Sequence, residues 1–371
     1  MNQVSLLRKT LKPILGWHGA RLNFLALFLM ALLRVKTINL TELATGFRSN
    51  AKIASCYKRL QRFFRNFDLD YSVIAKVVVT LMNIPQPWIL STDRTEWSFG
   101  QKRFNFLFLG VIHNGIAYPV VWTTLDKKGN SHSDERMDLL DRFHSIFPDA
   151  KIAYLTGDRE FIGKPWLSYL LIEPMIRFRL RIRNSDKIDD GGRQLRASII
   201  FAHLQPGQTQ TLSGKRLVWG RLVYVSALRL DNDELLIVIN PDSSGTAISD
   251  YGQRWGIETA ARGRRQALDL KSREPSTLFG MFKTRGFCLE STHFNNSERL
   301  SKLVALMTLA LCWAVKTGEW LHQHQPIKVK KHGRLAQSLF RYGLDHLRSI
   351  VTDLDIKHDE FLFSLQFLSC T

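Results

Sequence analysis

The sequence predicts an α/β protein in which a strand-rich central region lies between two helical regions. Hydrophobic residues recur at three- and four-residue spacing before about residue 85 and again after about residue 296, which indicates helices. Between them, short runs of β-branched and aromatic residues indicate strands. The 371 residues and 45% hydrophobic content are enough to bury more than one core.

The N-terminal region, residues 1–85, is predicted to be helical and to bind DNA. It holds 13 Lys and Arg residues against three acidic ones, so it supplies more than half of the formal net charge of +19. A helix, a turn at Gly46 and a second helix over 54–67 suit the insertion of a helix into a DNA groove. The second helix carries four basic residues, Lys58, Arg59, Arg62 and Arg65. The alternative is a helical bundle with a solvated basic face.

The order of elements from residue 86 is that of a ribonuclease H-like fold. Three strands, with a hairpin at Asn114-Gly115 between the second and third, precede a helix that opens at Ser133, and a further strand follows. The strands are predicted over 88–93, 104–111, 117–124 and 150–158. We therefore predict a ribonuclease H-like catalytic domain over 86–296. It contains an inserted β-rich subdomain over 176–245 and is followed by a helical C-terminal region over 297–371.

Cysteine spacing and hydrophobicity predict a cytoplasmic protein without a membrane partner. The four cysteines form no CxxC pair, so neither a zinc site nor a disulfide framework is indicated. The apolar runs 22–33 and 303–315 are shorter than the roughly 20 residues of a membrane span, and we interpret them as buried helices. A secretory signal, an amphipathic anchor and a lipidation signal are not evident. A basic membrane-surface protein is thus a weaker interpretation than a nucleic-acid-binding one.

Two aspartates, Asp93 and Asp158, stand at the ends of predicted apolar strands. Carboxylates in such positions can converge on a metal pair, because the sheet fixes the backbone while the loops leave room for substrate. Taken singly, an aspartate is more often a loop residue or a helix cap. Glu96 and Glu160 follow closely in sequence, and we interpret them as supporting or surface groups.

A third group of polar residues is Tyr251-Gly-Gln-Arg254-Trp-Gly-Ile-Glu258. In a helix, spacings of three and four residues place Tyr251, Arg254 and Glu258 on one face. Such a face offers a metal-binding carboxylate beside a cation and a phenol that both bind a DNA phosphate. The spacing alone favours an exposed ion pair between Arg254 and Glu258, worth about 0.3 to 0.5 kcal/mol.

Together, the three blocks resemble the signature of the DDE transposases of bacterial insertion sequences, of the IS-four type with a Tyr-Arg-Glu-Lys motif. The blocks are Ser91-Thr-Asp93-Arg-Thr-Glu-Trp, Thr156-Gly-Asp158-Arg-Glu-Phe-Ile-Gly and Tyr251-xx-Arg254-xxx-Glu258. Their order makes them far more specific than any one block, and the similarity runs from about residue 87 to 294. The resemblance implies that Asp93, Asp158 and Glu258 are catalytic and bind the metal.

The family's lysine, seven positions after the glutamate, is Arg265 here. Further along, Leu278-Phe-Gly-Met-Phe-Lys283 resembles the segment that normally follows the glutamate. Removal of residues 260–277 places Lys283 seven positions after Glu258, so we interpret 260–277 as an insertion. This segment is rich in Arg and contains Gly263 and Pro275, which disfavour one continuous helix. The alternative is that Arg265 takes the place of the lysine.

The resemblance implies cut-and-paste DNA transposition with two Mg²⁺ ions, or Mn²⁺ in their place, held by hard carboxylate oxygens. The ions would activate water or a DNA 3′-hydroxyl and stabilise the leaving oxygen. Tyr251, Arg254 and Lys283 would bind a DNA phosphate. The implied partners are double-stranded DNA, both terminal inverted repeats and target DNA, and a second copy of the chain on paired ends. The expected location is the cytoplasm, associated with the nucleoid.

Two other functions stay open on the sequence. A related metal-dependent DNA nuclease would cut DNA without joining it. A DNA-binding derivative whose catalysis is impaired by the segment 260–277 would bind element ends through its basic N-terminal region without cleaving them.

Overall fold

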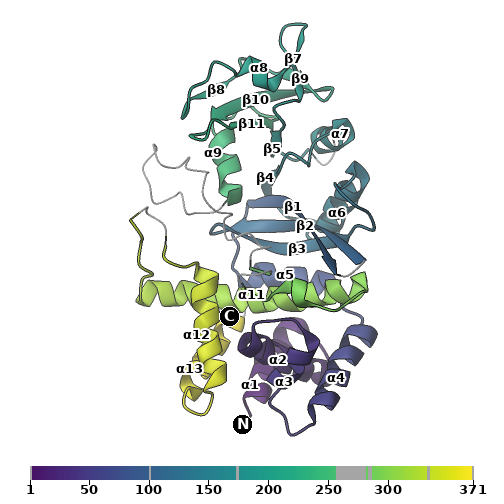
Figure 1. Cartoon of the computed structure of the whole chain (residues 1–371), viewed down its shortest axis with the longest axis vertical. Helices are drawn as coiled ribbons and strands as arrows, with labels where there is room; N and C mark the ends of the chain where they lie inside the picture. Colours follow the sequence, from purple (N-terminus) through teal and green to yellow (C-terminus); the bar gives the residue numbers. More distant parts are fainter. Residues whose placement is uncertain are drawn as a thin grey trace. The chain divides into compact units, whose positions relative to one another are not determined.

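The chain is described from a computed structural model, which confirms the predicted mixture of helices and strands (Figure 1). The structure describes residues 2–99, 102–172, 175–255, 281–282, 286–331 and 335–369. The chain divides into two compact units. The helical unit comprises Met1–Ile84, Glu96–Phe104 and Leu278–Thr371, and the sheet unit comprises Pro85–Thr95 and Asn105–Thr277.

Helices from both ends of the chain build the helical unit. They are α1 (Gln3–Leu15), α2 (Gly19–Val35), α3 (Leu40–Gly46), α4 (Ile53–Asn66), α5 (Tyr71–Leu81), α11 (Ser297–His324), α12 (Leu339–Thr352) and α13 (His358–Leu365). The predicted helix, glycine turn and second helix near the N-terminus correspond to α3 and α4. α11 packs against α2, α4, α5 and α12, so one core joins helices that lie more than 200 residues apart in sequence.

α11 is longer than the apolar run in its sequence. It has 28 residues and a mean hydropathy of 1.5 in its most apolar window, enough in length and composition to cross a membrane. However, 89% of that window is buried inside the protein. The bent pair of α1 and α2 passes the same test only if the two helices are joined across a 118° bend. Burial among α2, α4, α5 and α12 accounts for the apolar character of α11 as that of a core helix.

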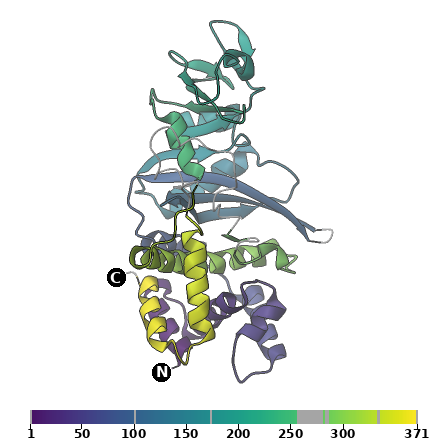
Figure 2. The same ribbon diagram turned by 60° about the vertical axis from the view of Figure 1, so that its left-hand side comes forward.

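Two glycines allow α11 and α12 to cross closely (Figure 2). A Cβ atom on Gly318 would lie 1.9 Å from the carbonyl oxygen of Leu339. A Cβ atom on Gly343 would lie 1.8 Å from the carbonyl oxygen of Ala314. Any larger residue at either position would therefore have to separate the two helices.

The sheet unit is organised around one mixed sheet, with strand order β3-β2-β1-β4-β5-β11-β10-β9-β6-β7 and β8 paired with β10. The strands of the predicted catalytic region are β1 (Trp88–Phe99), β2 (Lys102–His113), β3 (Ile116–Thr124) and β4 (Ile152–Gly157). The hairpin predicted between β2 and β3 is confirmed, because Asn114 and Gly115 have φ angles of 48° and 73° and the strands pair antiparallel. The predicted helix is α6 (Ser133–Ile146), which packs on β3 and on α7 (Lys164–Ile172).

The strands of residues 176–245 extend this sheet and do not form a separate one. They are β5 (Phe178–Ile182), β6 (Lys187–Asp189), β7 (Gln194–Arg196), β8 (Thr209–Thr211), β9 (Arg216–Val218), β10 (Arg221–Arg229) and β11 (Leu235–Asn240). β5 pairs parallel with β4 and antiparallel with β11. All residues of β5 and β11 are buried, as expected for central strands of a sheet that is covered on both faces. The expected inserted subdomain is thus continuous with the sheet that carries the site.

Candidate active site

Strand register brings Asp93 and Asp158 together. β1 and β4 are parallel neighbours in which Ser91 pairs with Thr156 and Thr92 with Gly157. Asp93 follows Thr92 within β1, and Asp158 directly follows the last residue of β4; adjacent strands lie roughly 4.8 Å apart. Asp93 does not end its strand as predicted, because β1 continues to Phe99. It marks the point where pairing with β4 ends.

Gly157 permits the close approach of the two strands just before the aspartates. A Cβ atom at this position would lie 2.7 Å from Oγ1 of Thr92 and 3.0 Å from Cβ of Phe161. The Thr92 hydroxyl donates to the carbonyl oxygen of Thr156 at 3.3 Å. A side chain at position 157 would therefore push β1 and β4 apart beneath the carboxylates.

Each aspartate is held by the backbone of the residue that follows it. The N–H of Arg94 donates to Oδ1 of Asp93 at 2.9 Å, and the N–H of Arg159 donates to Oδ1 of Asp158 at 2.7 Å. Within the described part of the chain, neither Oδ2 accepts a hydrogen bond. Burial raises the pKa of Asp93; Arg254 and the Arg94 N–H act in the opposite direction, and the charge of Asp158 adds to the rise. One oxygen of each carboxylate is thus fixed and the other is available.

Tyr251 lies on a short helix that ends before Arg254. α9 spans Ala247–Gly252, and Arg254 lies in the 3₁₀ turn Gln253–Trp255. The prediction of one continuous α-helical face from Tyr251 onward is therefore wrong for Arg254. Gly252 explains the break, because glycine is a poor residue for a helix interior. Glu258, Lys283 and the segment 260–277 lie outside the described residues.

Both side chains nevertheless reach the aspartates. The Tyr251 hydroxyl lies 3.5 Å from Oδ1 of Asp158, and Nη2 of Arg254 lies 3.6 Å from Oδ1 of Asp93. Burial raises the pKa of Tyr251 to about 12, so this phenol stays protonated at neutral pH. Burial would lower the pKa of Arg254, but the neighbouring Tyr251 and the charges of the two aspartates raise it. Nε of Arg254 is buried and has no hydrogen-bond partner among the described residues.

Arg179 on β5 anchors the helix that carries Tyr251. Its Nε donates to Oδ2 of Asp250 at 2.9 Å, and its Nη1 donates to Oδ2 of Asp242 at 3.2 Å. The Tyr154 hydroxyl donates to the backbone oxygen of Asp250 at 3.1 Å. Tyr251 itself is fully buried in a cluster with residues of β10 and β11, such as Leu228 and Val238. These contacts fix α9 on the sheet against β5, β10 and β11.

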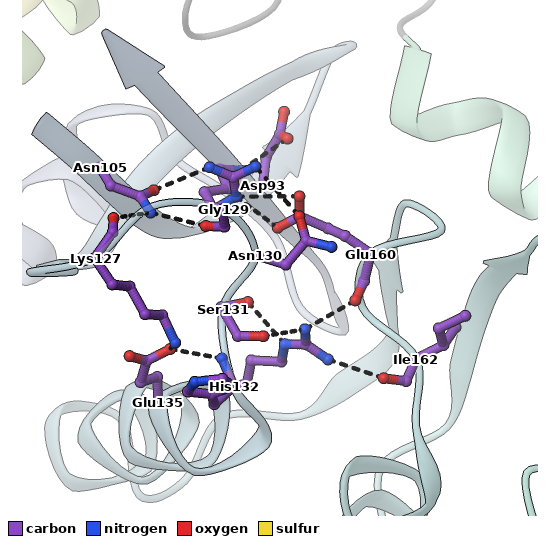
Figure 3. Close-up of polar contacts among 12 residues, drawn as sticks. Asp93, Asn105, Lys127, Gly129, Asn130, Ser131, His132, Glu135, Glu160 and Ile162 are labelled. Atoms are coloured by element: carbon purple, nitrogen blue, oxygen red, sulfur yellow. Dashed lines mark hydrogen bonds and ion pairs between the residues drawn. The ribbon is translucent and has the colours of Figure 1, made fainter. Parts of the chain in front are cut away.

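An ion pair joins the segments that follow the two aspartates (Figure 3). Nε of Arg94 donates to both oxygens of Glu160 at 3.1 Å. The other guanidinium nitrogens of Arg94 donate to Oδ1 of Asn105 at 3.1 Å and to Oδ1 of Asn130 at 3.4 Å. Burial raises the pKa of Glu160, and Arg94 opposes that rise. Because Arg94 follows Asp93 and Glu160 lies two residues after Asp158, this pair fixes the spacing of both carboxylates.

Arg136 on α6 binds Ser131 and the loop of Glu160 and Ile162, three residues that Figure 3 labels. Its guanidinium donates to the carbonyl oxygens of Glu160 at 2.8 Å and Ile162 at 3.1 Å, and to Oγ of Ser131 at 2.8 Å. It also lies over the ring of Phe161, with 5.2 Å from Cζ to the ring centre. Burial lowers the pKa of Arg136 to about 10, which leaves the side chain charged at neutral pH. Two carbonyl oxygens and one aromatic ring of the loop after β4 thus contact Arg136.

The structure therefore places four of the predicted site residues together, namely Asp93, Asp158, Tyr251 and Arg254. Among the described residues, no group of three or more His, Cys, Asp or Glu side chains forms a metal site. The sequence reasoning missed Arg94, Asn105 and Arg136, and it left Glu160 as a supporting or surface group. The one sequence signal for Arg94 is that an arginine directly follows each aspartate, in Asp93-Arg94 and in Asp158-Arg159. Glu96, by contrast, pairs with Arg103 at 2.7 Å within the helical unit.

The basic residues predicted to contact DNA differ in exposure. Lys58, Arg62 and Arg65 are exposed on α4, and Arg59 is half-buried. The opposite face of α4 is buried through Cys56, Leu60, Phe63 and Phe64. The helix thus presents a cationic face, as the predicted DNA-binding role requires.

Comparison with known proteins gives a likeness in structure but none in sequence. No protein-family model and no curated protein matches the sequence. The structure is similar to that of the piggyBac transposase in a cryo-EM structure of its synaptic complex with hairpin DNA. The likeness covers 99% of this chain and 82% of that chain, with a TM-score of 0.44 and 11% sequence identity.

Proposed function

We propose that this chain is a DNA transposase that cuts and joins DNA with divalent metal ions held by Asp93, Asp158 and Glu258. The observation that supports the proposal is the register of β1 and β4, two adjacent parallel strands in which Asp93 and Asp158 directly follow the last paired residues, Thr92 and Gly157. The order β3-β2-β1-β4-β5 with α6 between β3 and β4 supports a ribonuclease H-like core. The three sequence blocks support membership of the IS-four-type group.

The carboxylate pair fits a hard divalent ion. Each aspartate keeps Oδ2 available, and Mg²⁺ prefers carboxylate oxygens and retains several water molecules. The Asp93 side chain is 38% exposed, which leaves access for ions and for a DNA strand. When bound, two such ions supply activation of the attacking oxygen and stabilisation of the leaving one. Mg²⁺ is the proposed ion, with Mn²⁺ as its substitute.

Arg254 and Tyr251 would bind a DNA phosphate beside the carboxylates. Arg254 carries a fixed charge and a buried Nε without a described partner, and the protonated Tyr251 hydroxyl donates to oxygen. A phosphate oxygen that accepts from either group would be held within reach of Asp93 and Asp158. Lys283 is proposed as a third phosphate-binding residue from its place in the sequence motif.

The proposed substrates are the terminal inverted repeats of an element and its target DNA, bound by two copies of the chain in the cytoplasm. The basic face of α4, with Lys58, Arg62 and Arg65, would bind the repeats, and the half-buried Arg59 would support it.

Substitution of the aspartates tests the proposal. Asp93→Ala and Asp158→Ala should each abolish Mg²⁺-dependent cleavage of a duplex that carries an element end, while duplex binding in EDTA stays within about twofold. Asp149→Ala is the matched control, because Asp149 is exposed on the same unit. Joining of a 3′-hydroxylated end to plasmid DNA separates a transposase from a nuclease that only cuts. Cleavage that persists in both site variants would contradict the proposal.

A catalytically impaired DNA-binding derivative is the alternative that the end of α9 favours. The regular helix stops at Gly252, six residues before Glu258. Comparison of the chain with a version that lacks 260–277 separates the two functions. Cleavage by the shortened form alone would identify the segment as inactivating, and cleavage by the full chain would exclude impairment.

A further inference from the structure

A polar pocket lies in the helical unit, where α3, α4 and the start of α11 meet. Its volume is about 180 Å³, several times the roughly 30 Å³ that one water molecule takes up. The lining residues come from both halves of the chain: Asn39, Leu40, Thr41, Tyr57, Gln61, Arg65, His293, Phe294, Asn295 and Arg299. The pocket is therefore a product of the fold that no local sequence motif contains.

One face of α4 forms a wall of the pocket. Tyr57, Gln61 and Arg65 follow one another at four-residue spacing, so they lie in a row along the helix. This row overlaps the predicted DNA-binding set only at Arg65. Lys58 and Arg62 point to solvent and do not line the pocket.

The pocket is cationic. Arg65 and Arg299 approach it from the end of α4 and the first turn of α11, and none of the described lining residues is acidic. Neither guanidinium has an ion-pair or hydrogen-bond partner among the residues that the structure describes. The nearby carboxylate of Glu298 is neutralised by Lys302, whose Nζ lies 2.7 Å away.

Its walls are held in place independently of the two arginines. Asn296 caps α11 by accepting from the N–H of Arg299 at 2.9 Å, and Phe294 packs edge-on against Phe64 with ring centres 5.0 Å apart. Asn39 caps α3 by accepting from the N–H of Thr41 at 2.9 Å. Nζ of Lys102 donates to the carbonyl oxygen of Asn295, which adds a further positive charge close to the pocket. The cavity is thus preformed, and no described residue competes with a ligand for Arg65 and Arg299.

We propose that this pocket binds one phosphate of a nucleic-acid backbone, held between Arg65 and Arg299, with Tyr57 and Gln61 donating to the same group. The inference deepens the proposed function and rests on it for the source of the phosphate. Arginine favours phosphate because its planar guanidinium donates two parallel hydrogen bonds. α4 carries both a wall of the pocket and the basic residues Lys58 and Arg62. The pocket would therefore bind one phosphate of the DNA backbone while Lys58 and Arg62 contact neighbouring phosphates.

The salt dependence of the duplex-binding constant, measured in EDTA so that no cleavage occurs, tests the proposed phosphate site. Arg65→Gln and Arg299→Gln should each reduce the steepness of log K against log salt concentration by about 0.9, the value for one lost phosphate contact. Arg8→Gln on α1 is the matched control, because Arg8 is exposed and does not line the pocket. Arg299→Lys keeps the positive charge, so the slope of log K against log salt concentration should stay close to that of the unmodified chain. Thermal unfolding of each variant confirms that it is folded.

Inorganic phosphate is the second probe, because it reports on the pocket without DNA. It should stabilise the unmodified chain and Arg8→Gln against heat relative to chloride at equal ionic strength, and should stabilise Arg299→Gln less. An unchanged salt slope in both pocket variants would overturn the proposal. If the phosphate effect is lost while the slope is unchanged, the pocket takes a free anion and the nucleic-acid assignment is overturned. Cleavage that persists in the aspartate variants would overturn the metal-site proposal but would leave the salt slope and the phosphate effect unchanged, so the two proposals fail separately.

Discussion

Two arginines of the sheet unit and two arginines of the helical unit have different surroundings. In the sheet unit, Arg94 and Arg179 donate to carboxylates of their own chain and are 15% and 6% exposed. In the helical unit, Arg65 and Arg299 line a pocket and have no such partner among the described residues. The same side chain therefore fixes geometry in one unit and retains its binding capacity in the other.

The difference follows from what each region has to do. Carboxylates that bind a metal pair need a fixed separation, and buried arginines that bond to the adjoining loops supply it. A DNA-binding surface needs cations whose charge the protein does not already neutralise. Arginines with protein partners should thus matter for stability and catalysis, and arginines without them should matter for DNA affinity.

Arg94→Met is expected to have the largest effect on stability. It leaves the largely buried Glu160 without its cation, so the free energy of unfolding should fall by about 3 kcal/mol in chemical denaturation. Arg159→Met is the matched control, since Arg159 also follows a site aspartate but is exposed, and its effect should stay within about 0.5 kcal/mol. Equal effects of the two substitutions would remove the distinction between the two kinds of arginine.

The pair can be separated from the single residue by a double variant. Arg94→Met combined with Glu160→Leu should be less destabilising than the sum of the single substitutions, because neither charge is then left buried alone. Additive losses would mean that the ion pair does not couple the two loops.

Arg179→Met should have the next largest effect, through α9. Loss of its bonds to Asp250 and Asp242 should lower the free energy of unfolding by about 2 kcal/mol. Since α9 positions Tyr251, cleavage should fall as well, while duplex binding in EDTA stays unchanged. Arg177→Met, two residues earlier and exposed, is the control for both measurements. A variant that loses stability but cleaves normally would show that α9 does not position the site.

Arg62→Gln should have the smallest effect on stability. Arg62 is exposed on α4 and has no described partner, so the free energy of unfolding should change by less than about 0.5 kcal/mol. Duplex affinity should nevertheless fall, with a salt slope shallower by about 0.9 if it contacts one phosphate. A large loss of stability with unchanged duplex affinity would contradict the assignment of Arg62 to the DNA-binding face of α4.

Local patterns in the sequence predict the existence of the strands and the closeness of the two aspartates. The apolar runs that become β1 and β4, and the Asn114-Gly115 turn, depend on contacts between near neighbours in sequence. Their order then restricts how the sheet can form, so Asp93 and Asp158 could be expected to lie close together.

Features that depend on distant contacts were not predictable in the same way. Arg94 and Glu160 lie 66 residues apart, and nothing local indicates that they pair. The continuation of the sheet through β5 and β11 depends on which edge accepts the later strands. The three- and four-residue spacing of the motif predicts one continuous helix, whereas α9 ends at Gly252, where glycine has a low helix propensity.

The most direct test of the central claim is anomalous scattering from crystals of the chain that contain Mn²⁺. The proposed metal site predicts a peak whose ion is bound by Oδ2 of Asp93 and Oδ2 of Asp158, at roughly 2.0 to 2.3 Å from each oxygen. It also predicts the loss of that peak in Asp93→Ala. Absence of a peak between the two aspartates in the unmodified chain, with Arg254 still 3.6 Å from Asp93, would contradict a metal-dependent site.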